Sequence, residues 1–236
     1  MITKQDIDNA SMYVDGVNIA DYGVLVQSFK VGAIEQTAAL YQGRNRTNFN
    51  VLTTEQGMRP ITVQLFYKGR TRRELSLIKS KIDSLLIGKV ELSLPDGFMY
   101  SAALTQAGEE QILGVEYNEE IASCAYTFKG IRHDPLQTVS LESGDPIYCK
   151  STVPKTDCRL TCTASRSYTS LQIGPVTITN VASGDLIVAD GINGRILQNG
   201  APCAGNMSFI HFPSLTPGEN FITCPEDLTV EYYPTY

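Results

Sequence analysis

The sequence has no tryptophan and only two histidines among its 236 residues. Acid–base catalysis needs side chains that exchange protons near neutral pH, and His133 and His211 stand in no recognisable catalytic arrangement. The chain has no HExxH motif and no GxSxG nucleophile elbow. The Gly88-Lys89 pair lacks the glycine five residues earlier that a phosphate-binding loop requires. We therefore expect no enzyme, no catalytic residue, no metal and no cofactor.

Long apolar runs are also missing. No stretch approaches the roughly 18–20 apolar residues that cross a bilayer. The start, MITKQDIDNA, lacks the basic-then-apolar layout of a secretory signal. We expect the chain to fold in the cytoplasm and to insert into no membrane.

Positive charge is scarce. Nineteen Lys and Arg stand against 25 Asp and Glu, which gives a net charge of −6 and a pI near 5.0. Binding to duplex DNA depends on neutralising phosphates with basic side chains, so this composition argues against a nucleic-acid-binding surface. Acidic substrates are excluded on the same ground.

Six cysteines are too few for a disulfide scaffold in a chain of this length. We interpret them as reduced and mostly buried, while a pairing among them in an oxidising medium stays open. Cys158 and Cys162 are four residues apart, which places both on one face of a strand. Without a CxxC or a second Cys/His pair, packing is a better interpretation of them than a metal site.

One segment, residues 71–88, has a strong helical pattern. Its apolar side chains recur every three or four residues and form one stripe about 100° wide. They are Leu75, Ile78, Ile82, Leu85 and Leu86. Thr71 and Glu74 form a capping box at the start, and Gly88 supplies the left-handed residue that ends the helix. We expect its apolar face to cover a sheet.

Leu77 points away from that stripe, which suggests a second apolar contact beyond the helix's own sheet. Lys79 and Asp83 are four residues apart, a spacing typical of an ion pair on the solvent side. Arg72 and Arg73 oppose the helix dipole, so helix stability does not explain them.

Alternating apolar residues predict strands on both sides of the helix. The strands cover residues 61–68, 90–94, 98–104, 112–117 and 121–128. Asp15-Gly16, within residues 12–31, is a strong signal for a hairpin turn. The helix is then an insertion between two strands of one sheet.

Residues 32–60 interrupt this pattern with a polar stretch of little periodicity. Arg44, Arg46 and Asn48 stand close together in it. We interpret it as a long excursion or arm between strands, and loops of that length usually have a function. A surface loop with no partner is the plain alternative.

Beyond Pro135 the helical pattern disappears. Short strand-like runs follow, separated by turn dipeptides such as Asn193-Gly194 and Asn199-Gly200. The runs are 138–141, 159–164, 170–173, 176–180, 185–189, 195–198, 209–212, 220–223 and 228–232. We predict a mainly β protein with one α-helix and two domains. Residues 1–134 form a β-sandwich-like domain with the packed helix, and residues 135–236 form an all-β sandwich.

Several motifs resemble one known family. The segment 183–223, and above all the FPxLxPGxNxI run from Phe212 to Ile222, closely resembles the carboxy-terminal galectin-like domain of siphophage distal tail proteins. Residues 14–24, the strand–helix–strand unit 61–94 and the closing residues 230–234 look like the same family. One departure is that the second domain lacks the long inserted arm with which some members hold receptor-binding proteins.

The resemblance implies a structural phage tail-tip adaptor, located in the virion and assembled in the host cytoplasm. Residues 1–134 would form a homohexameric ring (the belt domain), and residues 135–236 would be the galectin-like domain. The ring would join the tail tube protein to the tail-associated hub protein and the host-adhesion device. DNA would only pass through its channel. Direct attachment of receptor-binding proteins stays open because the arm is missing.

Ring closure needs two complementary patches on each subunit. Our candidate interface residues are Leu77, Arg44, Arg46 and Asn48. The negative charge could give an acidic lumen along which DNA slides, or it could simply keep the protein soluble.

Two alternatives stay open. A carbohydrate-binding module of a phage tail or tail-like particle would need an exposed aromatic ring on which a pyranose stacks, and the chain has no tryptophan. An equivalent baseplate ring of a contractile tail has the same sequence requirements as the main interpretation.

Overall fold

The computed structural model describes residues 11–42, 44, 47–48, 50–203 and 205–236. The chain divides into two compact units, Met1–Arg132 and His133–Tyr236, so the units meet two residues before the boundary expected from the sequence. Strands dominate, and the described residues contain one α-helix, as predicted. Each unit is described by itself below.

Unit 1 contains an eight-stranded antiparallel sheet in the order β2-β1-β7-β8-β10-β6-β3, with β9 paired to β10. The strands are β1 (Tyr13–Val14), β2 (Val17–Asn18), β3 (Val24–Val31), β6 (Arg59–Gly69), β7 (Lys89–Ser93), β8 (Met99–Ala107), β9 (Gln111–Glu116) and β10 (Glu119–His133). The predicted opening hairpin is confirmed. Asp15 and Gly16 both have positive φ (49° and 80°), as a type I′ turn requires.

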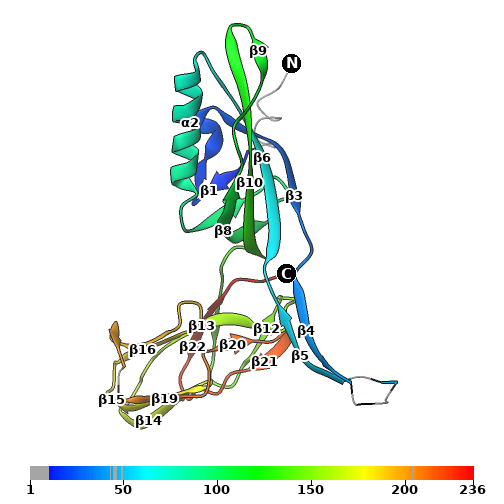
Figure 1. Cartoon of the computed structure of the whole chain (residues 1–236). Helices are drawn as coiled ribbons and strands as arrows, with labels where there is room; N and C mark the ends of the chain where they lie inside the picture. The colour runs from blue at the N-terminus through cyan, green and yellow to red at the C-terminus, as the bar shows by residue number, and fades with distance from the viewer. Residues whose placement is uncertain (1–10, 43, 45–46, 49, 204) are drawn as a thin grey trace. The chain divides into compact units, whose positions relative to one another are not determined.

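The helix α2 (Arg72–Leu85) covers one face of this sheet, as Figure 1 shows. The Thr71 side chain accepts a hydrogen bond from the Glu74 amide at 3.2 Å. The Glu74 carboxylate accepts one from the Arg70 amide at 2.8 Å, one residue earlier than a standard capping box. Both hydrogen bonds satisfy backbone amides at the start of the helix that have no partner within the helix.

The end of the helix differs from the prediction. The last helical residue is Leu85, and Leu86 is the C-cap, with its amide donating to the Asp83 carbonyl at 3.2 Å. The Leu86 side chain is fully buried, and its backbone already leaves helical geometry. Gly88 is left-handed (φ 85°), but it lies in the turn that leads to β7.

The apolar stripe of α2 packs into the core of unit 1. Leu75, Ile82 and Leu86 are buried, and Ile78 and Leu85 are partly buried against the same cluster. Each fully buried aliphatic side chain contributes roughly 1.5–3 kcal/mol. The predicted pair of Lys79 and Asp83 forms at 2.8 Å. Asp83 also accepts a hydrogen bond from the buried Tyr126 hydroxyl, which ties the helix to β10.

Unit 2 is all strand and turn in its described residues. Its seven-stranded sheet has the order β11-β22-β13-β16-β17-β18, with β20 joined to β13. These strands are β11 (Gln137–Leu141), β13 (Thr156–Thr163), β16 (Leu186–Asp190), β17 (Arg195–Gln198), β18 (Ala201–Pro202), β20 (Ser214–Leu215) and β22 (Leu228–Tyr232). Two smaller sheets share its core. They are β12 (Pro146–Cys149) with β21 (Gly218–Phe221), and β14 (Tyr168–Ile173) with β15 (Val176–Val181) and β19 (Met207–Phe209).

Most strands of unit 2 were predicted. The strands at 195–198 and 228–232 match to the residue, whereas the run predicted at 209–212 is wrong because β19 ends at Phe209. Strand β12 was missed altogether. It begins with a proline and has only four residues, so it carries too short an alternation to recognise.

A buried carboxylate organises one turn of unit 2. Asp190 is fully buried and accepts hydrogen bonds from the Asn193 amide and side chain at 3.0 and 2.8 Å. Arg159 and Arg195 each approach it to 3.3 Å. Burial alone would raise the pKa of Asp190, but these partners outweigh burial and hold the pKa below its usual value.

Candidate interaction surfaces

The structure places three of the four candidate interface residues. Leu77 is 55% exposed on α2, so it does not join the core of its own unit. Arg44 and Asn48 are exposed at the tip of a hairpin, and Arg46 lies outside the described residues. The hairpin comes directly before β6 in the chain, and the helix α2 comes directly after β6. Because β6 has 11 residues, its two ends are about 35 Å apart, so the structure does not bring Leu77 and the tip together.

The hairpin is formed by β4 (Gln36–Tyr41) and β5 (Asn50–Gln56), which pair in antiparallel register from Gln36↔Gln56 to Tyr41↔Asn50. The predicted excursion or arm between strands is therefore a two-stranded ribbon. Figure 1 shows it leaving the sheet of unit 1 between β3 and β6. Sequence alternation could not reveal it, because all six residues of β4 are exposed and no buried face imposes a pattern.

The ribbon carries exposed apolar side chains. Leu40, Tyr41, Val51 and Leu52 are 54–64% exposed, and we call them the ribbon surface. A lone two-stranded hairpin is at best marginally stable in water. Leu40 lies opposite Val51, and the next residue, Tyr41, points to the other face, so both faces of the ribbon expose apolar side chains. Such exposure is typical of a segment that meets a partner.

A second exposed apolar group lies at the turn between β9 and β10. Leu113, Val115 and Tyr117 are 53%, 70% and 92% exposed. A β-bulge at Leu113 interrupts the regular alternation of β9. Tyr117 and Asn118 both have positive φ (50° and 66°), which is uncommon for an aromatic residue. The sequence predicted a strand at 112–117, but nothing there indicated that these side chains would lack a cover.

Two ion pairs fix this turn against the rest of unit 1. Lys68 contacts Glu116 at 2.7 Å, and Arg72 contacts Glu120 at 2.6 Å. The second pair joins the start of α2 to β10. This contact explains Arg72, whose charge is unfavourable at the N-terminal end of the helix dipole. Leu77 follows Arg72 by five residues, about 7.5 Å along the helix, so it lies in the half of α2 that is nearer to this turn. We call Leu77, Leu113, Val115 and Tyr117 the helix–turn surface.

The two histidines form no shared site. His133 is buried, with Nδ1 2.9 Å from the Asp134 carbonyl and its ring edge-on to Tyr233. His211 is exposed, with Nδ1 2.8 Å from the Phe212 carbonyl. Among the described residues, no group of three or more His, Cys, Asp or Glu side chains is arranged to hold a metal ion.

All six cysteines are buried thiols. Cys158 and Cys162 lie on the inner face of β13, as their spacing predicted, and burial raises the pKa of Cys158 to about 12. Cys162 and Cys224 interact with each other. Their hydrogen bond raises the pKa of the Cys162 thiol and lowers that of the Cys224 thiol.

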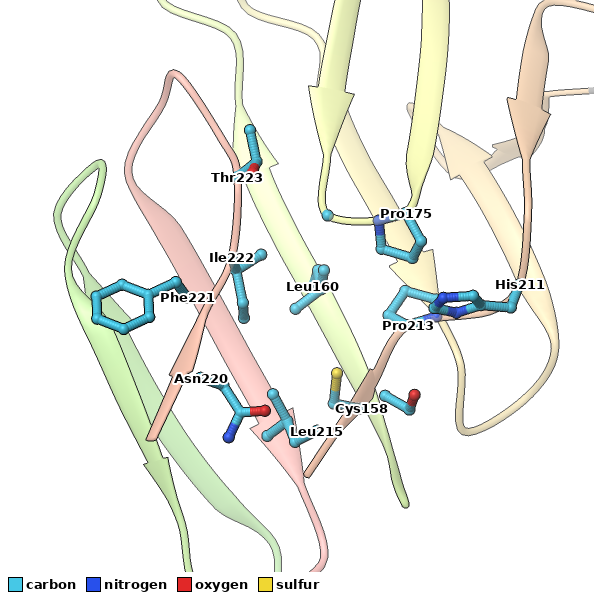
Figure 2. Close-up of a pocket in the computed structure, with 12 residues that line it drawn as sticks. Cys158, Leu160, Pro175, His211, Pro213, Leu215, Asn220, Phe221, Ile222 and Thr223 are labelled. Carbon is cyan, nitrogen blue, oxygen red and sulfur yellow. The ribbon is translucent and has the colours of Figure 1, made fainter. Parts of the chain in front are cut away.

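A cavity of about 270 Å³ opens in unit 2 where the two smaller sheets meet the strand β13. Figure 2 shows Leu160 and Ile222 pointing into it, with His211 on one side, while the Phe221 ring points away. The side chain of Asn220 lines the cavity, but its amide is engaged by the neighbouring turn. The lining mixes apolar side chains with the polar groups of His211, Ser214 and Thr223, so it does not define one class of ligand.

The same turn explains the FPxLxPGxNxI run. Asn220 accepts from the Thr216 amide at 2.8 Å and donates to the carbonyls of Thr216 and Gly218 at 2.7 and 2.9 Å. Gly218 has φ 89°, and Leu215 is buried in the core. The motif that carried the family resemblance is therefore structural: it shapes the approach to β21.

The two units differ in charge. Residues 1–132 contain fourteen Lys and Arg and fifteen Asp and Glu, a net charge of −1. Residues 133–236 contain five basic and ten acidic residues, a net charge of −5. Most of the excess negative charge therefore belongs to unit 2. Among the described residues, no helix has both the length and the apolar character needed to cross a membrane.

Comparison with known proteins gives a match in fold. No protein-family model and no curated protein matches the sequence. The crystal structure of the Dit protein (gp 19.1) of phage SPP1 matches with a TM-score of 0.70 and 14% identity, covering 96% of this chain and 98% of that chain. A chain of the phage p2 baseplate in its activated conformation with Sr matches with a TM-score of 0.50 and 11% identity, over 94% and 97% of the two chains. At these identities the likeness shows the fold.

Proposed function

We propose that this chain is a structural adaptor of a phage tail tip, a distal tail protein that joins the tail tube to the tail-associated hub and host-adhesion device. The fold match to SPP1 Dit supports this most directly, because it spans both units and nearly the full length of both chains. SPP1 Dit is described as a paradigm of the hub adsorption apparatus of phages that infect Gram-positive bacteria. The motif at residues 212–222 resembles the same family on separate grounds.

The proposed assembly is a homohexameric ring made through unit 1. A closed ring with head-to-tail contacts needs two different surfaces on each subunit. Unit 1 offers two exposed apolar surfaces at opposite ends of β6, the helix–turn surface and the ribbon surface. In the proposed ring they lie at contacts between neighbouring copies or between stacked rings, with Leu77 in the first and Arg44, Arg46 and Asn48 at the tip of the second.

Other parts of the proposal follow from the resemblance. The tail tube protein would stack on one side of the ring and the hub protein on the other, and DNA would pass through the centre. Because unit 1 has a net charge of only −1, the charge of the whole chain no longer supports an acidic lumen. Solubility is the simpler account of the acidic residues in unit 2.

The test is the native mass of the purified chain by light scattering after size exclusion, with negative-stain images of the same peak. Six copies in a ring with an open centre are expected. If the chain is a monomer alone, the measurement is repeated with the hub protein of the same phage, which should then assemble the ring. A monomer under both conditions would refute ring formation.

A pair of variants tests the helix–turn surface. Leu77→Asp places a charge on the exposed position and should shift the ring toward smaller species. Ser76→Asp adds the same charge at an exposed position about 100° around α2 from Leu77 and should leave the ring intact. Rings of normal mass and shape from Leu77→Asp would remove Leu77 from the interface.

A further inference from the structure

The small sheet formed by β12 and β21 presents one exposed face in unit 2. In the register of these strands, Pro146 is opposite Phe221 and Tyr148 is opposite Glu219. All four side chains point to the same side and all four are exposed. Tyr148 and Phe221 are 70% and 72% exposed. We call these four residues the aromatic face.

The strands that carry the aromatic face are anchored in the core of unit 2. The alternate residues of β12, Ile147 and Cys149, are 2% and 1% exposed and belong to the core of unit 2. On β21, the side chain of Asn220 is fixed by its hydrogen bonds to the 216–218 turn. The two rings therefore project from an ordered ribbon, and ordering them costs little on binding.

The rings of Tyr148 and Phe221 lie close enough for one ligand to contact both. Tyr148 and Phe221 occupy diagonal positions across the strand pair, a relation that places their backbones roughly 7–8 Å apart. Glu219 lies directly across from Tyr148 on the same face. A ligand that covers both rings therefore also meets a carboxylate, which accepts hydrogen bonds and donates none when ionised.

This combination matches a carbohydrate better than a protein. Pyranose rings stack their C–H faces on aromatic side chains, and their hydroxyl groups donate to carboxylates. Tyr and Phe are common in protein interfaces, but glutamate is depleted from their cores, so Glu219 beside the two rings is the residue that favours a glycan over a protein partner. The net charge of −5 on unit 2 disfavours anionic polymers such as teichoic acids or DNA.

We propose that the aromatic face of β12 and β21 binds a neutral or N-acetylated glycan chain, with Tyr148 and Phe221 as stacking platforms and Glu219 as the acceptor for hydroxyl or amide groups. The proposal does not rest on the ring, because the face belongs to unit 2 and is complete within one chain. A ring would multiply the sites and raise the avidity for a polymeric glycan.

The test is calorimetric titration of the full chain with chitohexaose and with cellohexaose. Binding with a Kd of about 0.1–1 mM is expected for at least one of them, as two stacked sugars and a few hydrogen bonds supply only a modest free energy. Tyr148→Ala and Phe221→Ala should each weaken binding about tenfold. Glu219→Gln should weaken it about threefold, because the amide keeps one acceptor oxygen.

Two controls separate stacking from general damage. Tyr148→Phe keeps the ring and should bind within about twofold of wild type. Phe209→Ala removes an aromatic side chain that is 42% exposed elsewhere in unit 2 and should leave binding unchanged. Each variant is first compared with wild type by thermal unfolding, where the exposed positions should show no loss.

Three results would overturn the proposal. One is no binding of either hexasaccharide at about 10 mM, a concentration that would reveal a millimolar site. Another is binding that Tyr148→Ala and Phe221→Ala leave intact. The third is a preference for poly(glycerol phosphate) over both neutral glycans, which would mean that the charge argument is wrong. Since none of these measures assembly, failure here is distinct from failure of the proposed ring.

Discussion

The two units expose different chemistry to solvent. Unit 1 is nearly neutral, and most of its exposed large apolar residues lie on the ribbon surface and the helix–turn surface. Unit 2 has a net charge of −5, and its aromatic face combines two exposed rings with a carboxylate. Near-neutral apolar surfaces favour association with other proteins, whereas an acidic surface disfavours it between like copies. The contrast fits the two proposals, in which copies of the chain assemble through unit 1 and unit 2 binds the glycan.

The largest expected effect falls on unit 2 alone. A Cβ at Gly191 would lie 2.2 Å from the Pro213 carbonyl oxygen and 2.8 Å from that of Cys158, and both are backbone atoms that cannot move aside. Gly191→Ala should therefore destabilise unit 2 by about 4 kcal/mol. Hydrogen–deuterium exchange with peptide resolution should show faster exchange in the variant across residues 133–236. The exchange rates across unit 1 should not change. Ser183→Ala, at an exposed turn, is the control, and uniform loss of protection in both units would mean that they unfold as one.

The next effect separates the two sides of α2. Leu75 is fully buried, so Leu75→Ala should destabilise unit 1 by about 3 kcal/mol. Leu77→Ala, at 55% exposure, should change the stability of the monomeric chain by less than about 0.5 kcal/mol. Chemical denaturation under conditions that prevent assembly makes this comparison. If the two variants lost the same free energy of unfolding, Leu77 would belong to the core of its own unit and could not contact a partner.

How much the sequence could predict depended on whether a signal was local. The helix was found because Thr71, Glu74 and a buried stripe all act within a few residues of one another. The strands 195–198 and 228–232 were found because turns or loops bound them and their inner residues alternate. The distal tail resemblance rested on a run that includes Asn220, whose hydrogen bonds are also local.

The rest depends on contacts that no local pattern records. Residues 32–60 were predicted only as an excursion or arm, and its two strands were missed, because pairing without a buried face leaves no alternation. Tyr148 and Phe221 are 73 positions apart in the chain, and only the register of β12 with β21 brings them together. Composition could not separate the exposed Tyr148 from the fully buried Tyr100, since both are tyrosines in strands.

Acid should affect the two units unequally through Asp190. Its pKa is lowered in the folded state, so this carboxylate stabilises unit 2 above its unfolded pKa near 3.8. That contribution is lost as the pH falls through the folded pKa. Asp190→Asn should cost unit 2 about 2 kcal/mol at pH 7, because it leaves Arg159 and Arg195 without their shared anion.

The measurement for Asp190 is the unfolding temperature of each unit at pH 7 and at pH 3. The gap between wild type and Asp190→Asn should shrink at pH 3, while unit 1 should respond equally in both proteins. A gap that stays constant with pH would show that the substitution acts through packing instead of charge.

The smallest effect concerns the start of α2, where the helix–turn surface begins. Thr71→Ala removes the acceptor for the Glu74 amide and should destabilise unit 1 by about 1 kcal/mol, whereas Thr71→Ser should be nearly neutral. The ion pair of Arg72 with Glu120 lies one residue further on, so fraying of this turn should also loosen the β9–β10 turn. Hydrogen exchange at residues 111–120 measures that coupling. If Thr71→Ala leaves exchange there unchanged, the helix end and the β9–β10 turn are independent, and the helix–turn surface is two separate contacts instead of one.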